Sequence, residues 1–304
     1  MPRTRGTRSI RDAVGWTCKR GYHNPAQKYE FFDIPTFRCG CRCGEEYPYN
    51  FENCLGDILV NSHKVLGDMP EEGIKGDCIQ HTFGKQMEVT KRVKAILQKK
   101  DPNSVPKMNS HDLKYKFEKR VGKVKCGSAK EVVHTALILK EQGIKSTDSK
   151  VVYKASNVSV VRRTDYGQIA AYLARGFPLH AGIYIGRTLS GLKFCCKYKP
   201  PRLGDFSKAK RSCISAHSIL LVGAGRKKGK WYFFFLNTWQ QFCLRFDCNG
   251  KVITRGIGKV VAGRLFRNLI RLSRFKEESN DMSLRHEDGI EISEYNKELI
   301  DVEH

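Results

Sequence analysis

Three residues that lie far apart in the chain have the side chains needed for nucleophilic catalysis: Cys78, His217 and Asn237. A cysteine attacks as its thiolate, and the pKa of a thiol falls at the N-terminus of a helix or beside a histidine that carries positive charge. The histidine must be held in one tautomer and orientation by a third group, and a side-chain amide can supply that hold. The residue types therefore predict a Cys-His-Asn site, provided that the fold brings them together.

A helix is predicted to begin at Cys78. Apolar residues recur at helical spacing after it and stop before Asp101-Pro102, at Ile79, Phe83, Met87, Val93 and Leu97. Asp77 has a side chain suited to the N-cap position, which places Cys78 in the first turn.

Two apolar runs between His217 and Asn237, separated by a stretch rich in glycine and lysine, predict a β-hairpin. If the turn is centred on Lys227, Val222 lies opposite Tyr232. The same register places His217 opposite Asn237, and the Cβ atoms of directly opposed residues are about 5 Å apart. The hairpin would thus place the base beside the amide that orients it.

Further elements are expected around these two. Helices are predicted over residues 129–143 and 166–175, closed by Gly143 and Gly176 in the left-handed conformation. A core strand is predicted over residues 178–185.

Composition divides the chain into three expected parts: a loop-rich, cysteine-containing extension over residues 1–69, a folded domain over 70–270 and an acidic tail over 271–304. Within the domain, the lysine-rich stretch 99–125 is expected to be a surface connection with a short helix near His111. The formal net charge is +24, although residues near the end of the chain are mainly acidic. Such a basic body would attract polyanions weakly at low salt.

Two runs in the second half resemble the papain-like cysteine protease family. Residues 215–225 read Ser-Ala-His-Ser-Ile-Leu-Leu-Val-Gly-Ala-Gly, and residues 231–239 read Trp-Tyr-Phe-Phe-Phe-Leu-Asn-Thr-Trp. In that family a histidine opens an apolar strand that ends in a glycine-rich turn, and the next strand ends in Asn-Ser-Trp. Residues 72–78, Glu-Gly-Ile-Lys-Gly-Asp-Cys, resemble the Gln-Gly stretch before the family's nucleophile. The resemblance covers about residues 65–260.

The resemblance implies an α+β fold of two lobes: a helical left lobe that carries Cys78 and a β-barrel-like right lobe that carries His217 and Asn237, with the substrate cleft between them. It implies hydrolysis of peptide bonds through an acyl-thioenzyme, with Cys78 as nucleophile and His217 as the acid that protonates the leaving amine. The expected partner is a peptide or protein substrate, and no cofactor is expected.

The family pattern also assigns substrate-binding roles. Gly127 and Ser128 would run beside the substrate backbone, and Trp239 would shield the His-Asn hydrogen bond from water. One residue departs from the pattern in the oxyanion region, because Glu72 stands where the family has a glutamine. A carboxylate there would repel the developing negative charge. The alternative is therefore a catalytically impaired protein that uses the same shell to bind a peptide or a polyanion.

Twelve cysteines raise the question of disulfides or metal. We find no apolar signal-peptide core and no transmembrane stretch, so we expect an intracellular protein, in the cytoplasm or nucleus, with free thiols and no membrane contact. Five cysteines lie in the first 69 residues, at positions 18, 39, 41, 43 and 54. Together with His23 they could bind zinc. Since Cys-x-Cys-x-Cys is not a common zinc-finger spacing, unliganded thiols and no metal are the expected state.

Overall fold

The computed structural model describes residues 15–60, 63–67, 77–122, 128–186, 188–193, 196–202, 215–238, 242–243, 245–246, 252–254, 256–264 and 269–279. Three of the expected site residues, Glu72, Gly127 and Trp239, lie outside these ranges. The rest of the acidic tail after residue 279 lies outside them as well.

The described part of the chain mixes helices with many short strands. The helices are α1 Cys78–Leu97, α2 Ser110–Val121, α3 Ala129–Glu141 and α4 Tyr166–Ala174, with the 3-10 turns η1 Leu55–Asp57, η2 Pro102–Ser104 and η4 Ala262–Arg264. The strands of the first half are β1 Trp16–Thr17, β2 His23–Asn24, β3 Phe51–Cys54, β4 Leu59–Val60, β5 His63–Lys64, β6 Ile144–Lys145 and β7 Val151–Val161. Those of the second half are β8 Leu179–Ile185, β9 Lys197–Tyr198, β10 Ser215–Lys227, β11 Lys230–Leu236, β12 Arg245–Phe246, β13 Val252–Thr254, β14 Ile257–Val261 and β15 Leu269–Ser279.

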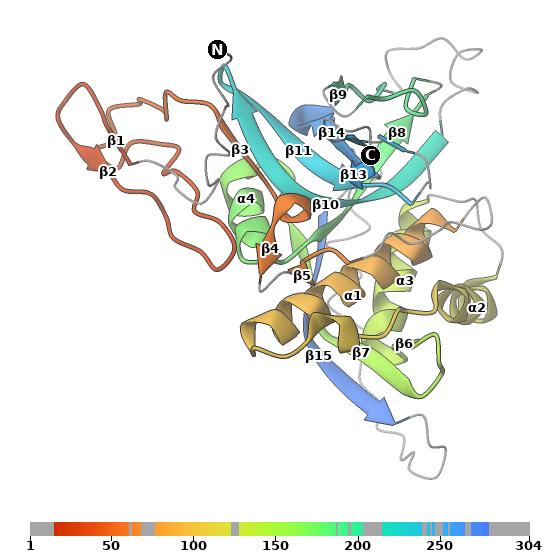
Figure 1. The fold of residues 1–304 in the computed structure, drawn as a ribbon. Helices are drawn as coiled ribbons and strands as arrows, with labels where there is room; N and C mark the ends of the chain where they lie inside the picture. Colours follow the sequence, from red (N-terminus) through yellow and green to blue (C-terminus); the bar gives the residue numbers. More distant parts are fainter. Residues whose placement is uncertain are drawn as a thin grey trace.

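One nine-stranded sheet runs through the molecule in the order β6-β7-β15-β8-β10-β11-β14-β9, with β3 paired to β10 off this path (Figure 1). Its ladders are antiparallel apart from the parallel pair of β14 and β9. The long strand β10 pairs with β8 over its first half and with β3 over its second half, while β11 lies along its other side. It is therefore the strand around which the sheet is organised.

Two hydrophobic cores divide the fold into two lobes. The helical lobe is built from the first turns of α1 with α2, α3, β6 and β7, and the sheet lobe from α4, β8, β10, β11 and β14. Helix α1 belongs to both, because Phe83 and Met87 pack in the helical lobe whereas Val89 and Val93 pack in the sheet lobe. The fold class is thus α+β with two lobes, as predicted, and Cys78 lies in the helical one.

The predicted helix boundaries hold for α1, α3 and α4, and β8 forms where the core strand was predicted. Gly143 and Gly176 follow α3 and α4 with φ angles of 71° and 81°, the left-handed conformation expected of them. Helix α2 is much longer than the short helix expected near His111. The Asn109 side chain caps it by accepting a hydrogen bond from the backbone N–H of Asp112, and Leu113 and Phe117 bury one face.

The hairpin forms, but its predicted register is wrong. Strand β10 continues through the glycine-rich stretch to Lys227, and the turn is Lys228-Gly229, with φ angles of 50° and 73°. Both angles are positive, as the tight type I′ hairpin turn requires. Gly225 therefore lies opposite Tyr232, and the register slips by one between Leu221 and Gly223.

Gly223 and Gly225 serve close packing rather than a turn. A Cβ atom on Gly223 would lie 2.4 Å from the backbone oxygen of Asn53 on β3, and one on Gly225 would lie 2.3 Å from the ring of Tyr232. The distant strand β3 thus explains glycines that, in the sequence alone, indicated a loop.

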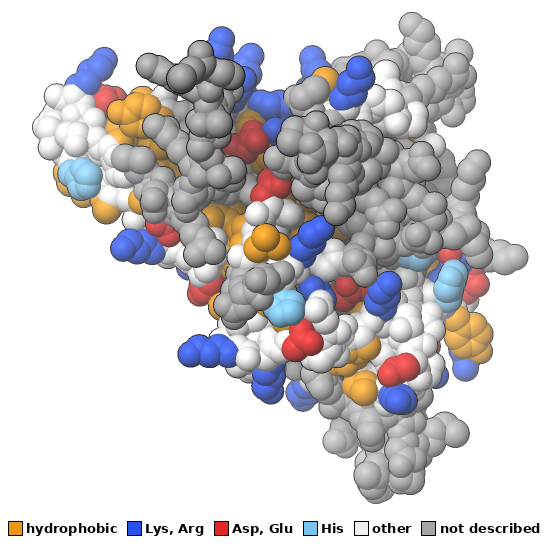
Figure 2. Space-filling model, viewed as in Figure 1, with side chains coloured by type: hydrophobic (Ala, Val, Ile, Leu, Met, Phe, Trp, Pro, Cys, Tyr) orange, Lys and Arg blue, Asp and Glu red, His pale blue; other side chains and the backbone are white. Residues whose placement is uncertain are grey.

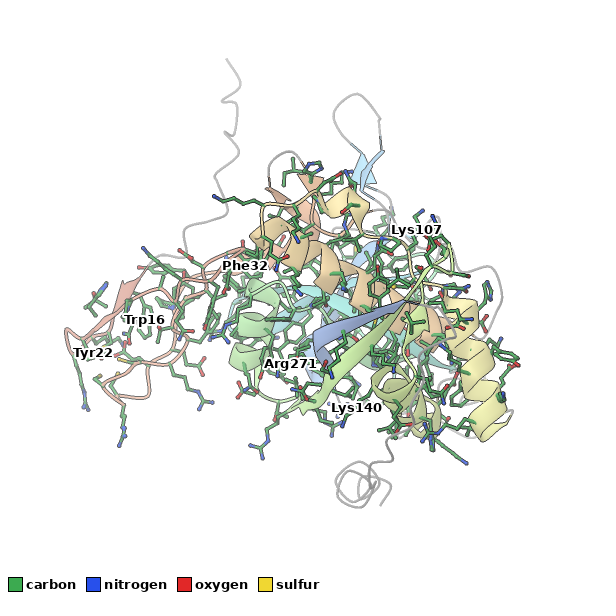
Figure 3. All side chains as sticks on the ribbon, turned by 90° about the horizontal axis from the view of Figure 1, so that it is seen from below. Trp16, Tyr22, Phe32, Lys107, Lys140 and Arg271 are labelled. Carbon is green, nitrogen blue, oxygen red and sulfur yellow. The ribbon has the colours of Figure 1, made fainter. Side chains whose placement is uncertain are left out.

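Residues 15–50 form an arm that projects from the sheet lobe (Figures 1 and 3). Its strands β1 and β2 have two residues each, and two isolated bridges, Gln27 to Ile34 and Arg38 to Glu46, add little more. Trp16 and Tyr22 lie on the arm and Phe32 lies nearer the body (Figure 3). The arm leads into β3, so the segment expected as an extension also supplies a strand of the main sheet.

No helix in the described ranges combines the length and the apolar character that crossing a bilayer requires. On the face drawn in Figure 2, Lys and Arg side chains are scattered and interspersed with acidic ones. They form no single basic patch on the described part of that face, so the view offers no support for a polyanion site.

Candidate active site

The clearest polar contact of the site joins His217 on β10 to Asn237, the residue directly after β11. Nε2 of His217 lies 2.8 Å from Oδ1 of Asn237, and both side chains are buried. The same Oδ1 accepts a hydrogen bond from the backbone N–H of Thr238 at 3.0 Å. Because an amide oxygen only accepts, Nε2 of a neutral His217 carries the proton and Nδ1 is the basic nitrogen.

Two features outside the His-Asn pair hold it in place. Asn237 donates its backbone N–H to the carbonyl of Gly256 at 2.7 Å, which fixes the chain at the end of β11. On the other side, His217 pairs in register with Ile183 of β8. The register of β10 with β11 pairs Leu220 with Leu236, so Asn237 follows opposite Ile219 and not opposite His217, its predicted partner. The imidazole and the amide therefore meet diagonally across the two strands.

Cys78 is the first residue of α1 and is 3% exposed. The expected N-cap by Asp77 is not formed, because the Asp77 carboxylate pairs with the ammonium of Lys114 on α2 and makes no hydrogen bond to the first turn. The N-terminus of a helix nevertheless favours an anionic group, since its backbone N–H groups and dipole point outward there. Cys78 thus stands at the helix N-terminus, as the sequence predicted.

Helix α1 packs against β10, the strand that carries His217. The Phe83 ring stacks on His180 of β8, with centroids 4.4 Å apart and planes 5° from parallel. His180 in turn bonds through Nε2 to the hydroxyl of Ser218 at 3.0 Å. A buried chain of contacts therefore runs from the second turn of α1 to the residue beside His217, and both α1 and β10 begin on the right in Figure 1.

His180 is a site neighbour that sequence reasoning missed. It is fully buried, and burial lowers its pKa from 6.5 to about 3. The ring is therefore neutral at pH 7 and serves packing and one hydrogen bond. Its signal in the sequence was a polar residue inside an otherwise apolar strand, Leu-His-Ala-Gly-Ile-Tyr-Ile.

Sequence reasoning also missed a pair of buried polar residues that links the first turns of two helices. Gln80 of α1 donates from Nε2 to the carboxylate of Glu131 on α3 at 3.1 Å, and both side chains are buried. Ser128, expected beside the substrate backbone, caps α3 by accepting a hydrogen bond from the Glu131 backbone N–H at 3.1 Å. Its hydroxyl is thus engaged in the cap.

No family model matches the chain, and no curated protein sequence matches it either. The solved structures to which the chain is similar include the following three. Xylellain from Xylella fastidiosa has a TM-score of 0.47 and 16% identity over 67% of this chain and 81% of that one. Procathepsin L 3 of Tenebrio molitor has 0.47 and 13% over 69% and 67%. Bromelain from Ananas comosus, in complex with the inhibitor E64, has 0.45 and 10% over 69% and 94%. None of these TM-scores reaches 0.5 and no identity exceeds 16%, so the likeness assigns no family, activity or substrate to this chain.

Proposed function

We propose that this chain is a cysteine peptidase that hydrolyses peptide bonds with Cys78, His217 and Asn237. The observation that carries the proposal is the buried hydrogen bond between His217 Nε2 and Asn237 Oδ1. A catalytic base needs one tautomer and one orientation, and this bond supplies both. The position of Cys78 at the start of a helix that packs against the histidine's strand adds the nucleophile.

The proposed reaction has two stages. The Cys78 thiolate attacks the carbonyl carbon of the substrate, and the peptide C–N bond breaks as the His217 imidazolium gives its proton to the leaving amine. This leaves a thioester on Cys78. His217 then removes a proton from water, which attacks the thioester and releases the acid product and the thiolate. Asn237 keeps the imidazole oriented through both stages.

The oxyanion region belongs to the proposal through its sequence alone. Glu72 replaces the glutamine of the family pattern, and losing one oxyanion donor typically costs about 10²- to 10³-fold in rate. In the family pattern the backbone N–H of Cys78 is a second donor, the backbone at Gly127 and Ser128 is assigned to the substrate, and Trp239 is assigned to shield the His-Asn bond. We therefore expect a slow peptidase.

A peptidyl epoxide that alkylates activated thiols tests the proposal. The full chain should form one covalent adduct, mapped to Cys78 by mass spectrometry of its peptides. The Cys78→Ala variant should form none, and a peptide library should be cleaved by the parent chain alone. Cys196→Ala, which removes an exposed thiol, is the matched control and should be labelled like the parent.

Two outcomes of this experiment would contradict the proposal. A folded parent chain that neither reacts with the epoxide nor cleaves the library would overturn the peptidase and leave a non-catalytic binding protein. An adduct mapped to another cysteine, with Cys78 unmodified, would count against the assigned nucleophile.

A further inference from the structure

Four cysteine sulfurs meet in the arm, away from the candidate active site. The Sγ atoms of Cys18, Cys39, Cys41 and Cys43 all lie within 4.8 Å of one another. Those of Cys39 and Cys41 are 3.2 Å apart, and those of Cys18 and Cys41 are 3.7 Å apart. Four thiolates around zinc at about 2.3 Å would be separated by about 3.8 Å. The sulfurs therefore already have nearly the spacing of a tetrahedral metal site.

Two tight turns deliver these sulfurs. Cys18 opens a turn closed by the hydrogen bond from Gly21 N–H to its carbonyl at 2.9 Å, with Gly21 at a φ of 80°. Cys39 opens a second turn, closed from Arg42 N–H at 3.2 Å, with Arg42 at a φ of 58°. A non-glycine residue in the left-handed region is uncommon and strained. At Arg42 this conformation belongs to the turn that brings the sulfurs of Cys39, Cys41 and Cys43 together.

A buried amide supports the cluster from outside. Asn24 is 1% exposed and directs Nδ2 at the sulfur of Cys39, 3.4 Å away. Its Oδ1 accepts the backbone N–H of Gly40 at 2.9 Å, and Nδ2 also reaches the carbonyl of Tyr22 at 3.3 Å. Hydrogen-bond donors to a ligating sulfur orient it and stabilise its negative charge. The buried Asn24 amide therefore provides a donor suited to a metal-bound thiolate at Cys39.

The charge of the surrounding sequence also suits a thiolate cluster. Zinc with four thiolates carries a net charge of −2, and four cationic residues stand near or between the cysteines in the sequence. These residues are Lys19, Arg20, Arg38 and Arg42. Glu45 and Glu46 follow Cys43, so four cations and two carboxylates leave a local formal charge of +2, opposite in sign to the cluster.

The secondary structure of the arm supplies few cross-links between its segments. Its two paired strands have two residues each. Its aromatic packing runs from Trp16 through Tyr47 and Phe37 back to the body, whereas Tyr22 at the far side is 47% exposed. Short segments without a sufficient core usually rely on disulfides or a structural metal. None of the cysteines that the structure describes forms a disulfide.

We propose that Cys18, Cys39, Cys41 and Cys43 bind one structural zinc ion as four thiolates. Four protein ligands fill a tetrahedral zinc site and leave no position for substrate, so the ion holds the arm together and takes no part in hydrolysis. Cys54, the other cysteine of this region, is apart from the set, because its sulfur accepts a hydrogen bond from Gly56 N–H at 3.4 Å and caps η1. The proposal is independent of the peptidase assignment.

Metal analysis of the full chain tests this site. Protein purified without added metal or chelator should contain one zinc per chain by plasma mass spectrometry. The double variant Cys39→Ser/Cys41→Ser should lose it, whereas Cys196→Ser should keep it. Replacing zinc by Co²⁺ in the parent chain should give the visible and near-ultraviolet absorption bands of tetrahedral cobalt thiolate, which needs no variant to fold.

Three results would overturn the zinc site. One is a folded parent chain without zinc whose thiols all react with a thiol reagent. Another is a mass that reveals a disulfide among the four cysteines. The third is a cobalt complex that lacks the thiolate bands.

Discussion

At the scale of single residues, Asn237 is the side chain that fixes the orientation of the His217 imidazole. Its carbonyl oxygen accepts from both His217 and the Thr238 backbone, so the amide cannot rotate without breaking two hydrogen bonds. The imidazole that it holds is buried, where an unpaired polar atom costs about 1 to 3 kcal/mol. The arrangement therefore resists rearrangement of either side chain.

Replacing Asn237 by Ala should slow catalysis more than it harms the fold. Without its acceptor the imidazole loses its preferred tautomer, and general acid–base catalysis is worth about 10²- to 10⁴-fold. We expect the rate of epoxide labelling and kcat to fall by about 10²-fold, measured beside the thermal melting temperature.

The matched control for that measurement is Ser218→Ala, which removes a hydroxyl beside His217 that bonds to His180. It should cost about 1 kcal/mol of stability and leave the labelling rate within a few fold of the parent. Equal loss of rate in both variants would show that the effect is structural.

His180 makes stability depend on pH. Its folded pKa is about 3, against 6.5 for the exposed ring, so the unfolded chain takes up a proton first as the pH falls. Above pH 6.5 the ring is neutral in both the folded and the unfolded chain, and its burial does not make the free energy of unfolding depend on pH. Below pH 6.5 the free energy of unfolding falls by about 1.4 kcal/mol per pH unit until the folded pKa is reached.

The His180→Gln variant should lower the free energy of unfolding at pH 7, because a stacked ring is replaced. Between pH 6.5 and 5 it should lose less stability than the parent chain, by about 1.4 kcal/mol per pH unit. Urea unfolding of the parent chain and of the variant at the two pH values measures how the free energy of unfolding of each depends on pH. Parallel slopes would contradict the assigned burial of a neutral ring.

At the scale of elements, α1 is the helix on which both lobes are built. It is buried nearly all round, so its polar side chains act as links between elements. Gln86 donates through Nε2 to the carbonyl of Pro178, before β8, at 2.9 Å and to that of Ile270 on β15 at 2.8 Å. Arg92 likewise bonds to the carbonyls of Val65 and Pro102.

Replacing Gln86 by Leu should destabilise the chain by about 2 to 4 kcal/mol. The change keeps the volume of the side chain but leaves two carbonyl groups without the donor they now share, in the core. Denaturant unfolding measures the loss. Gln98→Leu, at the exposed end of the same helix, is the matched control and should change stability by less than about 0.5 kcal/mol. A Gln86→Leu variant as stable as this control would show that the link is dispensable.

The sequence predicted elements well where the signal was local and periodic. The apolar spacing after Cys78 predicted α1, and glycines predicted the ends of α3 and α4. It failed where a distant segment decides the local structure. Gly223 is required by the approach of β3, which lies early in the chain, so a strand interior had the pattern of a turn and the hairpin register came out wrong.

At the scale of the whole molecule, the two-lobe α+β class followed from the resemblance of a few motifs. Residue types and the hairpin pattern had already selected His217 and Asn237, which the structure joins. For zinc, the sequence offered a larger group, five cysteines and His23, and did not select the four sulfurs that the structure brings together. Cys18 is separated from Cys39 by a stretch of loop, and only the two turns of the folded arm bring their sulfurs together. Sequence spacing alone contains no such information.

Strand β15 lies between β7 and β8 in the middle of the sheet, yet it is the last described strand in chain order. During synthesis, β7 and β8 leave the ribosome well before their shared neighbour does. Until residues 269–279 emerge, both strands present unpaired edges, and Gln86 lacks one of its two acceptors. Completion of the sheet therefore waits for residues 269–279, and until they emerge the open edges of β7 and β8 can pair with other chains.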